Sequence, residues 1–172
     1  MKEHCFYDLK LASVCLVLSM ATTLVAAEPN NIADILKTNG FDWLIGQWDT
    51  ITDSNEKAHA EFNFILDGFA LSTKAKVGRS EYEGLAYFVP HKNTIINTGV
   101  DNDGRTFGGT WEIQGDKLVL KLQQTNPDGA INNFIRFLSN VDADTMKSIT
   151  YRVIDGRRSD EPLNILEFKR RK

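Results

Sequence analysis

Apolar and polar side chains alternate with a period of two along most of the chain beyond residue 45. One run carries Phe62, Phe64 and Leu66. Such alternation is typical of β-strands that bury one face. Turn signals such as Asp67-Gly68 and Asp103-Gly104 separate the runs. The other runs are Leu85, Tyr87, Val89; Phe107, Gly109, Trp111, Ile113; and Leu118, Leu120, Leu122.

These runs and turns predict an all-β fold with short connections between successive strands. Short connections make neighbours antiparallel, so the predicted sheet is a meander. Closure into an up-and-down barrel removes the exposed edges of such a sheet, and a two-sheet sandwich is the alternative. A barrel of about ten strands is wider than an eight-stranded one, so an internal cavity is expected. The ten predicted strands span residues 45–52, 58–66, 70–77, 80–89, 94–101, 106–114, 117–125, 130–140, 145–154 and 163–169.

One short helix is predicted ahead of the strands. Ile32, Ile35 and Leu36 have helical spacing, Asn30 or Asn31 can act as the N-cap, and Asn39-Gly40 ends the segment.

The first 27 residues have the pattern of a cleavable export signal. Lys2 and Lys10 precede an apolar stretch, and Val25-Ala26-Ala27 supplies small residues at the cleavage site. A membrane anchor is disfavoured because serines and threonines interrupt the stretch, so no span is expected after processing. The predicted division is a signal peptide at 1–27, a helical segment at 28–40 and a barrel domain at 41–172. The predicted location is periplasmic or extracellular.

Loss of this leader changes the chemistry available to the protein. Cys5 and Cys15 both lie in the leader, so the remaining domain has neither a thiol nor a disulfide. The formal net charge of -3 disfavours nucleic acid as a partner, because such binding depends on cationic side chains. The sequence does not specify an oligomeric state.

Residues 41–48, Phe-Asp-Trp-Leu-Ile-Gly-Gln-Trp, carry a Gly-X-Trp that leads into the first strand. This run resembles the start of lipocalin-like (calycin) domains. The whole of 41–169 is similar to a family of small, often exported bacterial lipocalin-like domains of unknown function. The other matching motifs are Phe64-Ile-Leu-Asp-Gly-Phe69, Gly84-Leu-Ala-Tyr-Phe-Val-Pro-His-Lys-Asn93, Asp103-Gly104 with Gly109-Thr-Trp111, Asn126-Pro-Asp-Gly129 and Arg152-Val-Ile-Asp-Gly156.

The resemblance implies a closed barrel with a tryptophan near its base, and it implies no catalytic residues. Several relatives carry a tryptophan in the strand that here holds residues 94–99, and another after Gly115-Asp116. This chain has Ile-Ile-Asn-Thr and Lys-Leu-Val-Leu at those places. Any pocket is therefore lined differently, and a relative's ligand cannot be transferred.

Five residues are candidates for binding a ligand inside the barrel. The interior is expected to mix small residues, Gly84, Ala86 and Gly109, with large aromatic ones. Trp48 is expected to pack at the base. The strand that holds Arg136 is ambiguous because both of its faces carry apolar residues, and Arg136 is expected to be exposed. The candidate ligand-binding residues are Phe64, Tyr87, Phe107, Trp111 and Arg152.

Neither catalytic residues nor a metal site are predicted. His59 and His91 are the histidines outside the leader, and no converging ligand set accompanies them. No Gly-X-Ser-X-Gly elbow or phosphate-binding glycine loop occurs. No cofactor is expected. The sequence favours a barrel that binds a small, mostly apolar ligand. A structural or protein-interaction module with a filled barrel is the alternative, and an enzyme acting on a bound hydrophobic substrate is a weaker one.

Overall fold

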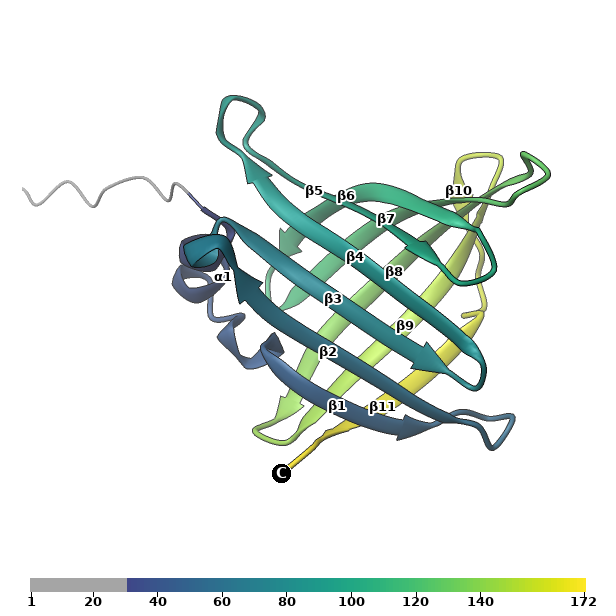
Figure 1. The fold of residues 1–172 in the computed structure, drawn as a ribbon, viewed down its shortest axis with the longest axis horizontal. Helices are drawn as coiled ribbons and strands as arrows, with labels where there is room; N and C mark the ends of the chain where they lie inside the picture. Colours follow the sequence, from purple (N-terminus) through teal and green to yellow (C-terminus); the bar gives the residue numbers. More distant parts are fainter. Residues whose placement is uncertain (1–30) are drawn as a thin grey trace, which may run out of the picture.

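The chain folds into a closed antiparallel β-barrel (Figure 1). A computed structural model describes residues 31–172, so the predicted leader and Asn30 lie outside the described residues. Strand β9 pairs with both β8 and β11, and β11 pairs with β1, which closes the ring. The ten strands of the ring are β1 (Gly46–Ile51), β2 (Lys57–Ile65), β3 (Ala70–Val77), β4 (Ser80–Val89), β5 (Thr94–Asp101), β6 (Thr106–Gln114), β7 (Lys117–Thr125), β8 (Ile131–Asp142), β9 (Thr145–Ile154) and β11 (Asn164–Arg170).

The predicted ten-stranded up-and-down barrel is confirmed, and the sandwich alternative is excluded. One element was missed: β10 (Arg157–Arg158) pairs with Val153 and Ile154 on β9 and stays outside the ring. Two residues are too few for a period-two pattern to show in the sequence.

The predicted helix is α1 (Ile32–Thr38), which lies at one end of the barrel (Figure 1). Asn31 is its N-cap, and the Asn31 side chain accepts a 2.8 Å hydrogen bond from the backbone N–H of Asp34. Ile32, Ile35 and Leu36 are buried in the core. The short 3₁₀ turns are η1 (Asp42–Leu44), η2 (Leu66–Gly68) and η3 (Pro90–Lys92).

Trp48 is the centre of the barrel base, as the sequence predicted. Its side chain is fully buried, and its indole Nε1 donates a 3.0 Å hydrogen bond to the carbonyl of Leu44. The guanidinium of Arg170 lies 4.2 Å from the Trp48 ring. Arg170 also donates to the carbonyls of Trp43 and Ile45, at 2.6 and 2.8 Å. Helix α1, η1 and these side chains close the base.

For strand β4 the sequence predicted both that Leu85 and Tyr87 are buried and that Gly84 and Ala86 face the interior. These two sets lie on opposite faces of the strand, and the structure decides between them. Register places Gly84 and Ala86 beside the inward Thr73 and Leu71, so these small residues face the interior. Leu85 and Tyr87 point outward and are 42% and 39% exposed. The expectation of a buried Leu85–Tyr87 face was therefore wrong. The physical reason is that the Tyr82 ring lies against Gly84 and occupies the space that larger inward side chains would need.

Strand β8 overturns the expectation that Arg136 is exposed. Arg136 pairs in register with Leu120 and Thr150, both buried, and its side chain is directed to the inside of the barrel. The apolar residues on the other face of the strand have a separate explanation. Phe137 packs edge-on against Tyr151 at 5.9 Å, and the guanidinium of Arg158 lies 4.5 Å from the Tyr151 ring. An aromatic and cationic stack thus covers the outer face of β8.

No helix within residues 31–172 has the length and apolar character needed to cross a bilayer.

Candidate functional site

The most unusual group inside the barrel is the guanidinium of Arg136. Its Nε donates a 3.1 Å hydrogen bond to the hydroxyl of Thr150. Among the described residues, Arg136 forms no ion pair with a carboxylate. Burial lowers the pKa of Arg136, and the nearby Tyr82 phenol raises it by a smaller amount. A guanidinium remains protonated in proteins, so the barrel contains an uncompensated positive charge.

Tyr82 and Asn97 lie beside this charge, on β4 and β5. Burial raises the pKa of the Tyr82 phenol, while the charge of Arg136 and the amide of Asn97 act in the opposite direction. The Tyr82 ring packs edge-on against Phe107, with 5.2 Å between the ring centroids. At Gly84 and Gly99 the Tyr82 ring occupies the space where a Cβ would lie. The phenol is therefore held in one place by its neighbours.

Two enclosed polar atoms near this group have no partner. Within residues 31–172 they are the side-chain oxygen of Asn97 and the indole nitrogen of Trp111, and both residues are 5% exposed. Asn97 pairs in register with Gly109, two residues before Trp111 on β6. Buried polar atoms without partners destabilise a fold by about 1–3 kcal/mol each, so they are uncommon away from functional sites.

The middle of the barrel is not completely filled by side chains. Tyr82, Phe107, Leu122, Phe134 and Arg136 all lie at inward register positions, yet each retains accessible surface. The two terminal Nη groups of Arg136 have no hydrogen-bond partner within residues 31–172 and are not enclosed. They therefore also reach open space. In contrast, the residues nearest the base, such as Leu71 and Leu118, are fully buried. We call the half-filled region around Arg136 the lumen.

The structure brings four of the five predicted ligand-binding residues to the inner wall. Phe107 contacts Tyr82 in the lumen, and Trp111 lies closer to the base. Phe64 packs against the base core. Arg152 is at an inward register position but is exposed, on the part of β9 farthest from the base. Tyr87 is the exception, because it points out of the barrel.

The predicted ligand-binding set did not include the residues at the centre of the lumen: Tyr82, Asn97, Arg136 and Thr150. One signal was present for Tyr82. Gly84 and Gly99 occupy adjacent positions on β4 and β5, next to the single inward tyrosine of that region. Paired inward glycines indicate that a ring lies across the strands. No comparable signal marked Arg136.

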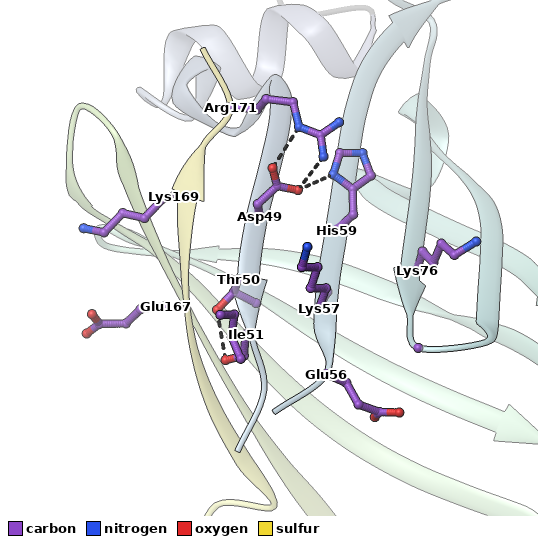
Figure 2. A pocket seen from close by; sticks show the side chains of 12 residues that line it. Asp49, Thr50, Ile51, Glu56, Lys57, His59, Lys76, Glu167, Lys169 and Arg171 are labelled. Atoms are coloured by element: carbon purple, nitrogen blue, oxygen red, sulfur yellow. Dashed lines mark hydrogen bonds and ion pairs between the residues drawn. The ribbon is translucent and has the colours of Figure 1, made fainter. Parts of the chain in front are cut away.

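A shallow groove of about 830 Å³ lies on the outer face of β11, β1 and β2. Figure 2 shows Arg171 and His59 converging on Asp49 in this groove. Arg171 Nε and His59 Nδ1 each lie 2.8 Å from a carboxylate oxygen of Asp49. The hydrogen bond from Arg171 is the main cause that lowers the pKa of Asp49. Asp49 is thus already partnered, as is Lys76 by Glu81.

The lumen is a better candidate site than this outer groove. The groove's central carboxylate is satisfied by residues of the chain itself, and within residues 31–172 no hydroxyl or thiol forms a hydrogen bond with His59. The lumen instead holds a charge and polar atoms without partners. A second groove of about 680 Å³ lies beside α1 and is lined by Ile35, Phe88, Ile95 and Trp111 among others.

Residues 31–172 contain no group of three His, Cys, Asp or Glu side chains that could hold a metal ion. The fold and the lumen define a closed ten-stranded antiparallel barrel, which is compatible with a lipocalin-like fold. A scan against protein-family models gave no match, and neither did a search of curated proteins.

Proposed function

We propose that this chain is an exported, lipocalin-like protein that binds a small, mostly apolar molecule in the lumen of its barrel. The observation that carries the proposal is the contrast within the interior. Residues of the base such as Leu71 and Leu118 are fully buried, whereas Phe107, Leu122 and Phe134, at inward register positions, retain accessible surface. Apolar walls with a few convergent polar groups are the usual composition of small-molecule sites.

Binding is tested by measuring the melting temperature with a panel of fatty acids, retinoids and aromatic acids, together with native mass spectrometry. A ligand that binds only the folded protein raises the melting temperature in proportion to ln(1 + [L]/Kd). Leu122→Trp should fill the lumen and abolish the shift. Gln123→Trp, on the next and outward position of β7, should retain it.

If no member of the panel shifts the melting temperature and the two tryptophan variants behave alike, the binding proposal fails. A structural or interaction module with a filled barrel then takes its place.

Export is a separate part of the proposal and has its own test. Intact-mass analysis of protein recovered from the periplasm or medium should show a chain that begins at or near Glu28. A soluble form that keeps residues 1–27 would contradict export by this route.

A further inference from the structure

We infer that the bound molecule carries an anionic head group of the carboxylate class, and that Arg136 binds this head group inside the lumen. The inference rests on the proposed function, because it names the chemistry of the ligand for the same site.

The first argument is the missing counter-charge. Arg136 is partly enclosed by the apolar barrel wall, where an ion without a partner is unfavourable, and a guanidinium cannot escape by losing its proton. The described residues supply one neutral acceptor, the Thr150 hydroxyl, and no carboxylate. Asp101 is the buried acid at an inward position, and Arg105 already pairs with it at 2.6 Å. An anion from outside the chain would complete the site.

The second argument is that the Nη end of the Arg136 guanidinium has no hydrogen-bond partner. Its Nε is engaged by Thr150, which fixes the plane of the guanidinium. The two Nη groups form no hydrogen bond with residues 31–172 and reach open space. This end of the guanidinium presents parallel N–H groups that match the two oxygens of a carboxylate.

The third argument is the placement of neutral polar groups around the charge. Tyr82 can donate its hydroxyl to a bound oxygen, because a phenol is protonated at neutral pH. Asn97 is almost fully buried, and its side-chain oxygen has no partner. These groups explain why polar atoms lie in an otherwise apolar interior.

The apolar part of the ligand then has one place to go. The base beyond Trp111 is closed by Trp48, Arg170 and helix α1. A tail therefore lies along Phe107, Leu122 and Phe134, on the side of the barrel away from the base. Arg152 lies at that side and adds a second positive charge along the path of an entering anion.

The test compares two ligands that differ only in the head group, decanoate and 1-decanol, at pH 7.5 by isothermal titration. Wild-type protein should bind decanoate about tenfold more tightly or better, since hydrogen bonds to charged groups are the strong ones. Arg136→Met should remove this preference and leave decanol binding within about twofold. Arg171→Met removes the same charge from the outer wall and should keep the preference.

The ligand-free variants give a second readout. Arg136→Met should unfold at the same temperature as wild type or higher, because an uncompensated charge is replaced by an apolar side chain of similar length. A purely structural arginine would give a lower melting temperature. If Arg136→Met does not fold, Arg136→Gln, which can still donate to Thr150, is titrated in its place.

The outcomes separate the two proposals. Equal affinity of wild type for decanoate and decanol, or a preference that survives Arg136→Met, overturns the anionic head group and leaves lumen binding intact. Failure of both ligands and of the whole panel overturns lumen binding, and the head-group inference with it.

Discussion

Arg170 and Arg136 lie at two levels of this barrel, and their surroundings differ sharply. Arg170 at the base stacks on Trp48 and donates to the carbonyls of Trp43 and Ile45. Arg136 in the lumen forms one hydrogen bond with the described residues, to Thr150. The same side chain is therefore satisfied by the fold at one level of the barrel and left incomplete at the other. Removing Arg170 would leave its partners unpaired, whereas the free Nη groups of Arg136 are available to a ligand.

The base should give the largest loss of stability when it is disrupted. Trp48→Ala is expected to lower the free energy of unfolding by about 3–5 kcal/mol, as large aromatic deletions in cores do. Trp48→Phe and Trp111→Phe form a matched pair, measured by chemical denaturation. The Trp48 indole N–H has a partner, Leu44, and that of Trp111 has none within residues 31–172. Trp48→Phe should therefore cost more. Equal costs would mean that the hydrogen bond from Trp48 to Leu44 adds nothing to the stability of the base.

Arg170→Met tests the base arginine itself. The variant loses the stacking on Trp48 and leaves the carbonyls of Trp43 and Ile45 without their donor. We expect the free energy of unfolding to fall by about 2–3 kcal/mol, measured by urea denaturation. Arg136→Met in the same assay should show no loss. A loss of similar size in both variants would mean that both arginines are structural.

Gly84→Ala tests whether the Tyr82 ring fills the space beside Gly84 in the lumen. An added Cβ would collide with the Tyr82 hydroxyl and lie 2.8 Å from the Thr98 carbonyl. Such overpacking should cost about 1–3 kcal/mol in thermal or chemical unfolding. Gly108→Ala is the control, because a Cβ added there would have no atom within 4 Å. Combining Gly84→Ala with Tyr82→Phe should recover part of the loss. No recovery would show that the hydroxyl is not the cause and that the Tyr82 ring carbon or the Thr98 carbonyl accounts for the loss.

The sequence was sufficient to predict the barrel because the signals for strands are local. Alternation and turn residues located all ten strands of the ring, and Asn31 with Ile32, Ile35 and Leu36 located the helix. Trp48 was assigned to the base by the resemblance of residues 41–48 to the start of lipocalin-like domains. Each of these features depends on residues that are close in the chain.

The lumen was harder to predict because a strand's pattern does not say which face is inside when both are apolar. On β8 the outer Phe137 is covered by Arg158 from the short β10, which no pattern revealed. Arg136 was consequently assigned to the wrong face. On β4 the Tyr82 ring occupies the inner space, so the small Gly84 and Ala86 face inward and Tyr87 lies outside. Both errors come from contacts between residues on different strands.

The smallest expected effect concerns Arg171, which follows Arg170 in the chain but lies on the outer wall. Its pairing is the main cause that lowers the pKa of Asp49 below the ordinary value of 3.8 (Figure 2). A carboxyl with a lowered pKa stabilises the folded state above its unfolded pKa, and this contribution is lost as the pH falls through the folded pKa. Wild-type protein should therefore lose stability below about pH 4 more steeply than Arg171→Gln. Melting temperatures measured between pH 7 and pH 2.5 would show this steeper loss.

At neutral pH the difference in stability between wild type and Arg171→Gln should be small, because the side chains of Arg171 and Asp49 are largely exposed. Asp142, Glu81 and Glu112 also have lowered pKa values, so both proteins share their acid sensitivity and the difference isolates Asp49. If the two acid profiles coincide, the outer pair adds nothing to the seam between β1 and β11, and Arg170 alone accounts for the arginine contribution there.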